Sequence, residues 1–177
     1  MIDPKAYGDA LFLLCEESGT TDALHGELET VDGVLKDNPD YVALLDTPAL
    51  PAEEKTRLIG EAFGTLHTDH VSFLKILSEK HAIYAYGACR AAFDARYDET
   101  RGIERVTAVT AVPLTPAQSA ALVAKLTAKT QKKILLTNIT DPSLLGGIRL
   151  RYMGKQIDAS LATRLSSLEQ AVRDIVL

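Results

Sequence analysis

Glycine and lysine residues between Asp141 and Leu168 come nearest to a phosphate-binding motif in this chain. The segment reads DPSLLGGIRLRYMGKQIDASLATRLSSL and contains the pair Gly154-Lys155. A P-loop needs a glycine five residues before that pair's glycine and a Ser or Thr after the lysine, so that backbone amides wrap a phosphate and a hydroxyl reaches magnesium. Arg149 and Gln156 occupy those positions instead. We therefore expect no nucleotide cofactor at this segment.

The neighbouring glycine pair does not form a dinucleotide-binding fingerprint either, because Ile148 stands where a further glycine is required. A structural role explains these glycines better. Gly146 and Gly147 would let the chain enter a strand through a conformation closed to residues with a Cβ atom. Gly154 would serve a hairpin turn.

Histidine and serine residues offer no catalytic or metal site. His67 and His70 are three residues apart, whereas zinc-binding helices place two histidines four apart around a glutamate and need a third ligand. We expect them to form a solvent-facing cluster at a helix start. Ser160 follows Asp158, but all four histidines, the bases that a serine nucleophile needs, lie in the other half of the chain. We expect Asp158 or Ser160 to cap a final helix.

Composition is typical of an ordered protein, with 46% hydrophobic and 24% charged residues. No apolar run approaches the ~20 residues that span a bilayer. The N-terminus lacks the basic start and the cleavage site of a signal peptide. Cys15 and Cys89 lie among apolar residues at helical spacing, which predicts buried free thiols and not a disulfide framework.

Charge is divided unevenly along the chain. Residues 1–102 hold 19 acidic and 9 basic side chains, a net charge of −10, whereas residues 103–177 hold 5 acidic and 10 basic ones, a net charge of +5. This asymmetry predicts two modules that face different partners.

The first module is predicted to be helical throughout. Leu24, Leu28, Val31 and Leu35 recur at the spacing of one helix face. The last long helix is expected from about Ile83 to Arg101. Residues that stop helices or tolerate positive φ break the module at Ser18-Gly19, Asn38-Pro39, Pro48 to Pro51 and Gly64. These breaks leave about six helices in a compact bundle.

The second module alternates strands and helices. Residues 104–112, 132–139, 148–152 and 155–158 have strand character, and Thr115-Pro116-Ala117-Gln118 supplies the capping box of a helix that runs to about Thr130. A final helix would carry Leu161, Leu165, Leu168 and Val172. We therefore predict an α+β protein: an N-terminal six-helix bundle in residues 1–102, then a small α/β module in residues 103–177 with a short mixed sheet and two helices.

Two helices of the bundle carry more apolar residues than one buried face needs. Phe73 and Ile76 point away from the face of Leu74 and Leu77, and in the first helix Ala6, Ala10 and Leu13 accompany Tyr7, Leu11 and Leu14. Two explanations stay open at this point. Both helices could be covered on all sides at the centre of the bundle, or they could border a groove that accepts a partner's amphipathic helix.

Basic residues of the second module could form a patch. Lys132, Lys133, Arg149 and Arg151 would suit nucleic acid, but the sequence pI of about 5.4 and aromatic residues that are not interleaved with the bases disfavour it. An acidic helix of a protein partner would use the same charges.

Several segments together resemble a known family. These are YGDALFLL from Tyr7, NPDYVALLDTPALPAEEK from Asn38 and LLGGIRLRYMGKQIDASLATRLSSL from Leu144. In these segments and in its two-module order, the chain is similar to the delta subunit of rotary proton-transporting ATP synthases, the oligomycin-sensitivity-conferring protein family.

The resemblance implies a non-catalytic stator subunit without a cofactor. The helical module would bind N-terminal helices of the alpha subunits between its first and fifth helices, at Tyr7, Leu11, Phe73 and Ile76. The second module would bind the peripheral-stalk b subunits, with Arg149 and Arg151 as candidates. Gly146, Gly147, Gly154, Asp158 and Ser160 form the structural motif that carries the resemblance.

The resemblance also implies a location and a role. The protein would lie at the cytoplasmic face of a bacterial plasma membrane, or at an organellar membrane as a mature chain, and would meet the membrane only through its complex. There it would resist rotor torque, so that proton flow stays coupled to ATP synthesis. The alternative hypothesis is a nucleic-acid-binding adaptor that uses the basic second module.

Overall fold

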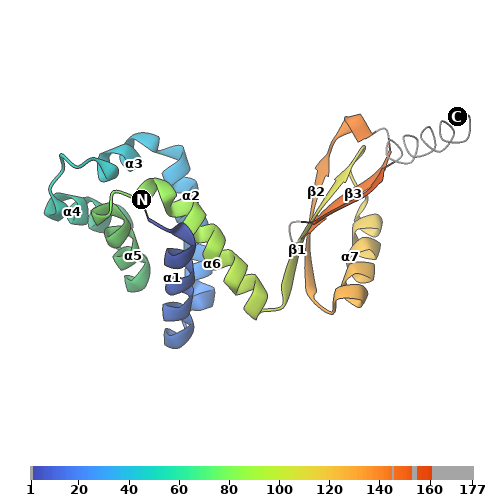
Figure 1. Cartoon of the computed structure of the whole chain (residues 1–177), viewed down its shortest axis with the longest axis horizontal. Coiled ribbons are helices and arrows are strands. Elements are labelled where there is room, and N and C mark those ends of the chain that lie inside the picture. Colours follow the sequence, from blue (N-terminus) through green and yellow to red (C-terminus); the bar gives the residue numbers. More distant parts are fainter. Residues whose placement is uncertain (1, 145, 153–154, 161–177) are drawn as a thin grey trace, which may run out of the picture. The chain divides into compact units, whose positions relative to one another are not determined.

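A computed structural model describes residues 2–144, 146–152 and 155–160 (Figure 1). The chain divides into two compact units, Met1–Tyr97 and Asp98–Leu177, and each is described here by itself. Within the described residues, no helix has both the length and the apolar character needed to cross a bilayer.

The first unit is a helical bundle, as predicted. Its helices are α1 (Pro4–Ser18), α2 (Thr21–Asp37), α3 (Pro39–Asp46), α4 (Ala52–Phe63), α5 (Thr68–Glu79), the short 3-10 helix η1 (Ile83–Ala85) and α6 (Tyr86–Thr100). Local signals explain the ends. Gly19 terminates α1 in the left-handed conformation at φ 71°, Pro39 occupies the first turn of α3, and Pro51 immediately precedes α4.

The core of this unit follows the predicted helix faces. Leu24, Leu28, Val31 and Leu35 of α2 are all buried. Both thiols are free and buried, as expected, and burial raises the pKa of Cys89 to about 11. The remaining large apolar members include Phe12, Leu45, Ile59, Phe63, Leu74, Leu77, Ile83 and Phe93.

A glycine brings α1 close to α6. A Cβ atom at Gly8 would lie 2.2 Å from the carbonyl oxygen of Cys89 and 2.6 Å from the Cβ of Ala92. Both distances are far shorter than van der Waals contact, so the two helices can approach this closely only with glycine at position 8.

One histidine prediction was wrong. His70 does not face solvent but is completely buried, between Glu27 of α2 and Tyr86 of α6. His67 does lie at the helix start, where its side chain accepts a hydrogen bond from the backbone N–H of Asp69. The three-residue spacing turns the two side chains to different environments, because only one lies on the buried face of α5.

The second unit contains a four-stranded mixed sheet, as predicted. Its elements are β1 (Ile103–Thr110), α7 (Pro116–Thr130), β2 (Lys133–Thr140), the 3-10 helix η2 (Pro142–Leu144), β3 (Gly147–Tyr152) and β4 (Lys155–Ser160). The strand order is β2-β1-β3-β4. β1 and β2 are parallel, with α7 as the crossover, whereas β3 pairs antiparallel with both β1 and β4.

The capping box predicted for the helix of this unit is present at Thr115 and Gln118. Gly146 and Gly147 have φ values of 150° and 85°, as expected for a strand entry closed to other residues. The predicted final helix and the turn at Gly154 lie outside the described residues.

Candidate functional site

The main candidate site is an apolar groove between α1 and α5, with a volume of about 350 Å³. All four residues predicted from the sequence and the family resemblance border it, two from each helix. The lining consists of Ala6, Tyr7, Ala10, Leu11 and Leu14 of α1 and Asp69, Ser72, Phe73 and Ile76 of α5. The structure thus brings together residues that are more than fifty positions apart in the chain.

The groove has a buried floor and an exposed rim. Leu11 and Phe73 belong to the hydrophobic core, so they form the floor. Leu14 and Ile76 are 49% and 46% exposed, which is unusual for large apolar side chains so close to one another. Leu13, which is 53% exposed, does not border the groove. Cover within the bundle therefore explains Leu11 and Phe73, whereas Leu14 and Ile76 stay exposed beside an open groove.

Small residues and one acidic residue characterise the lining of this groove. Ala6 and Ala10 have too little volume to fill the space between the helices. Burial raises the pKa of the Cys15 thiol, and the charge of Asp69 adds to that shift. Asp69 lies at the start of α5, and it is the charged residue among the described lining.

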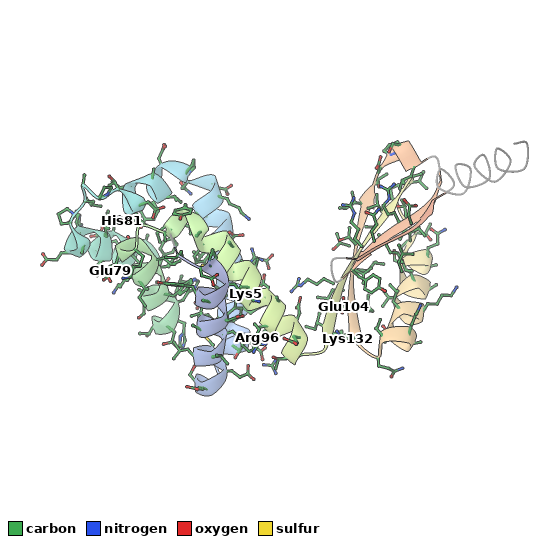
Figure 2. All side chains as sticks on the ribbon, viewed as in Figure 1. Lys5, Glu79, His81, Arg96, Glu104 and Lys132 are labelled. Carbon is green, nitrogen blue, oxygen red and sulfur yellow. The ribbon has the colours of Figure 1, made fainter. Side chains whose placement is uncertain are left out.

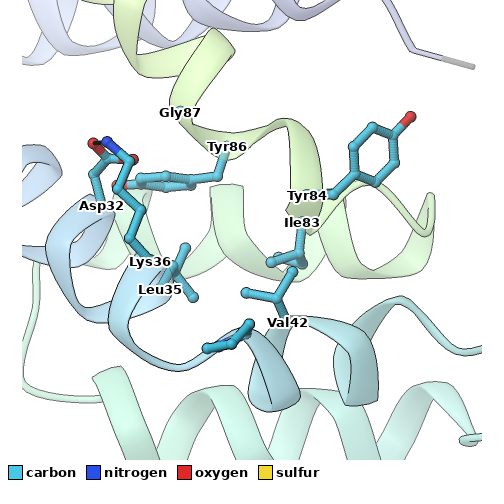
Figure 3. A pocket seen from close by; sticks show the side chains of 9 residues that line it. Asp32, Leu35, Lys36, Val42, Ile83, Tyr84, Tyr86 and Gly87 are labelled. Carbon is cyan, nitrogen blue, oxygen red and sulfur yellow. Dashed lines mark hydrogen bonds and ion pairs between the residues drawn. The ribbon is translucent and has the colours of Figure 1, made fainter.

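A second hollow of about 310 Å³ lies between α2, α3, η1 and the start of α6 (Figure 3). The carboxylate of Asp32 borders it and lies 2.7 Å from Lys36 Nζ and 2.8 Å from Arg90 Nη1. These pairs lower the pKa of Asp32, although burial opposes the shift. Because Asp32 already has two cationic partners, the hollow offers no charge in need of a ligand, and we regard the α1/α5 groove as the site.

In the second unit, the candidate residues Arg149 and Arg151 lie on one face of β3. Their partners across the sheet are Val109 and Thr107 of β1. Arg149 Nε lies 2.9 Å from a carboxylate oxygen of Asp158, and Arg151 Nε donates a hydrogen bond of 3.2 Å to Gln156. Arg149 is therefore neutralised within the sheet, and Arg151 remains the more exposed of the two.

Asp158, one of the two residues predicted to cap a final helix, lies in β4, and that helix is outside the described residues. β4 extends to Ser160, so Asp158 lies inside the strand, where its carboxylate pairs with Arg149. Ser160 is the last residue of that strand. The sequence pattern did not reveal this ion pair, because the same residue type serves before a helix and in a cross-strand pair.

Charge in the predicted basic patch is partly compensated. Figure 2 shows Lys132, next to β2, and Glu104 on β1; Lys132 Nζ lies 3.1 Å from the Glu104 carboxylate. Together with the pair of Arg149 and Asp158, this leaves fewer free cations than the sequence suggests. The sequence could not show these pairs, since their members are far apart along the chain.

The groove is bordered by two helices and is apolar along its lining except at one polar end. Such a groove is typical of an adaptor that binds a helix of another protein. The model of the ATP synthase delta (OSCP) subunit family matches residues 4–172. The chain therefore belongs to this family, whose members are non-catalytic subunits of an enzyme complex.

Individual relatives agree with the family match. The chain is 31% identical over 171 residues to ATP synthase subunit delta of Azorhizobium caulinodans, covering 96% of this chain and 92% of that protein. It is 33% identical over 167 residues to the subunit delta of a Geobacillus species, covering 94% of each. A chain of the Toxoplasma gondii mitochondrial ATP synthase hexamer has the same fold, with a TM-score of 0.76, 21% identity and coverage of 97% and 98%.

Proposed function

We propose that this protein is a stator subunit that holds the catalytic head of the ATP synthase to its peripheral stalk. The first unit would bind an N-terminal helix of an alpha subunit in the α1/α5 groove, and the second unit would bind the b subunits. Family membership supports the assignment. The observation that carries it is the groove itself, where exposed Leu14 and Ile76 stand above a floor of Leu11 and Phe73.

Geometry explains why a helix suits this groove. An amphipathic helix presents a row of apolar residues about 5 Å apart, and the groove presents apolar side chains along two turns of α1. Docking would cover Ile76 and Leu14, and burying an exposed side chain of this size contributes on the order of 1–2 kcal/mol. Because the turning rotor exerts torque on the catalytic head, such a contact would have to resist that torque. Several buried apolar side chains would contribute more binding energy to it than exposed ion pairs do.

The proposed location follows from the same assignment. As a subunit that joins two other parts of the complex, the protein would lie at the cytoplasmic face of the membrane and meet the bilayer only through its partners. For the b subunits, the exposed Arg151 on β3 is the residue we would test.

Isothermal titration of the full chain with a peptide from the N-terminus of the cognate alpha subunit tests the proposal. We expect one-to-one binding with a negative heat-capacity change, since apolar surface is buried. Ile76→Asp should weaken binding by tens of fold or more, because it places a charge in an apolar contact. Leu13→Asp is the matched control: it adds the same charge to an equally exposed leucine that does not border the groove. Equal loss in both variants, or no binding by the unaltered protein, would contradict the assignment.

A further inference from the structure

Asp69 differs from every other residue that borders the α1/α5 groove. Among the described lining residues it is the only charged one, and Ser72 is the only other with an aliphatic polar side chain. Its side chain is 27% exposed, so the carboxylate is partly covered by the groove but open to a ligand. An isolated carboxylate at the edge of an apolar surface costs desolvation energy when a partner covers it, unless the partner supplies a cation or a hydrogen-bond donor.

One histidine, His67, lies beside this carboxylate. His67 Nδ1 lies 3.5 Å from Asp69 Oδ2, but the same nitrogen accepts a hydrogen bond of 3.3 Å from the backbone N–H of Asp69. In that arrangement Nδ1 is the acceptor of the backbone N–H and does not serve as the donor to the carboxylate. Within the described chain, no Lys or Arg nitrogen is within ion-pair distance of Asp69.

The carboxylate also has a defined place along the groove. It lies in the first turn of α5, and Ile76 lies seven residues further along the same helix. Seven residues of helix correspond to about 10 Å. The groove therefore has a negative end and, about two helical turns away, an apolar end at Ile76.

We propose that Asp69 binds a Lys or Arg side chain of the docked helix and thereby determines the direction in which that helix lies. This inference rests on the proposed function and names a chemical requirement for the partner. A suitable helix carries a basic residue about seven positions from the apolar residue that covers Ile76. A helix docked the other way round would place an apolar residue over Asp69 and leave the carboxylate covered without a partner.

A simpler role for Asp69 must be separated from this one. An acid in the first turn of a helix stabilises that helix through the helix dipole, whether or not a ligand is present. Asp40 is the matched control, because it is an exposed acid in the first turn of α3 and does not border the groove.

The test is a titration of the full chain with the alpha-subunit N-terminal peptide at low and high salt, with thermal melts to check folding. Asp69→Asn should weaken binding about three- to tenfold at low salt and reduce its salt dependence, as expected for one partly exposed ion pair. Asp69→Lys should weaken binding further and should be rescued by a peptide whose basic residue is replaced by Glu. Asp40→Asn should bind like the unaltered protein.

The outcomes separate this inference from the proposed function. If Asp69→Asn binds with unchanged affinity and unchanged salt dependence while Ile76→Asp does not bind, the groove docks a helix but Asp69 does not recognise a cation. If the unaltered protein does not bind the peptide at all, the proposed function and this inference are both overturned.

Discussion

His70 Nε2 lies 2.8 Å from the hydroxyl oxygen of Tyr86, inside the helical unit and away from solvent. The other ring nitrogen, Nδ1, lies 3.1 Å from a carboxylate oxygen of Glu27. Because a carboxylate can only accept, Nδ1 carries a proton. In the neutral ring Nε2 then accepts from the Tyr86 hydroxyl, whose other acceptor, the Leu28 carbonyl oxygen, is more distant at 3.4 Å. This chain of polar groups joins α2, α5 and α6 through the core.

Removing the tyrosine hydroxyl should destabilise the bundle. Tyr86→Phe leaves His70 Nε2 buried without its hydrogen bond, which costs about 1–3 kcal/mol. Urea denaturation would measure the loss. Tyr84→Phe is the control, because Tyr84 lies in η1 between two buried residues but is itself exposed. This change should alter the free energy of unfolding by less than about 0.5 kcal/mol. Equal effects of the two changes would argue against a role for this hydrogen bond.

Acidification should destabilise the protein through His70. Burial lowers the pKa of His70, and the Glu27 carboxylate only partly opposes that shift. Below the ordinary histidine pKa of about 6.5, the unfolded chain therefore binds a proton at His70 that the folded chain does not bind. Neutral His70 thus contributes fully to the free energy of unfolding above that pH. It should fall by up to about 1.4 kcal/mol per pH unit as the pH drops toward the lowered pKa.

Denaturation at a series of pH values, with and without His70→Gln, would measure this contribution. The variant should be less stable near neutral pH but should lose less stability on acidification, because it lacks the titrating group. An identical pH dependence in both proteins would assign the effect to other groups.

Gly8 should be intolerant of any side chain. Gly8→Ala would place a Cβ 2.2 Å from the Cys89 carbonyl oxygen, which forces α1 away from α6 and should cost about 1–3 kcal/mol. Gly26→Ala is the contrasting change, because nothing lies within 4 Å of a Cβ at that helical position. It should stabilise the protein by about 0.5–1 kcal/mol through helix propensity. Thermal unfolding of both variants would show opposite signs if the packing is as described.

Floor and rim of the groove should respond differently to truncation. Phe73→Ala removes a buried core side chain and should cost about 3–5 kcal/mol of stability. Ile76→Ala removes a side chain that is almost half exposed, so it should cost about 1 kcal/mol or less. Chemical denaturation without any ligand would test this difference. A large loss for Ile76→Ala would mean that this residue serves the core and not a partner.

Asn138 should matter to the second unit. Its amide nitrogen donates to the Ala108 carbonyl and the Thr110 hydroxyl, and its amide oxygen accepts from the backbone N–H of Leu114. Asn138→Ala should therefore loosen the end of β1 and the turn before α7, at a cost of about 1–3 kcal/mol. Amide hydrogen exchange of residues 108–114 would increase, whereas exchange in α2 should not change.

Features that depend on neighbours along the chain could be predicted. The Leu24 to Leu35 face of α2 is buried because its spacing matches one helical turn. The start of α7 follows from Thr115, Pro116 and Gln118, whose hydrogen bonds span only three residues. The strands of the second unit were found within one or two residues by their β-branched content or alternation.

Roles that depend on distant partners were missed. His70 was expected at the surface because nothing near it in the sequence reveals Glu27 or Tyr86. The ion pair of Asp158 with Arg149 was not predicted, because it depends on the register of β3 and β4. Asp69 was not singled out at all, since an acid in the first turn of a helix is ordinary until the groove beside it is seen.

The sequence by itself determined the two-module organisation, the order of the described helices and strands, and the surplus of apolar residues on α1 and α5. These properties arise from local spacing, capping and composition. Only the tertiary structure decided that Leu11 and Phe73 form the floor of the groove, that Leu14 and Ile76 form its rim, and that Asp69 is the charged residue at one end. Burial and charge pairing depend on residues that are distant along the chain. For the same reason, no local pattern predicts how closely Gly8 lets α1 approach α6.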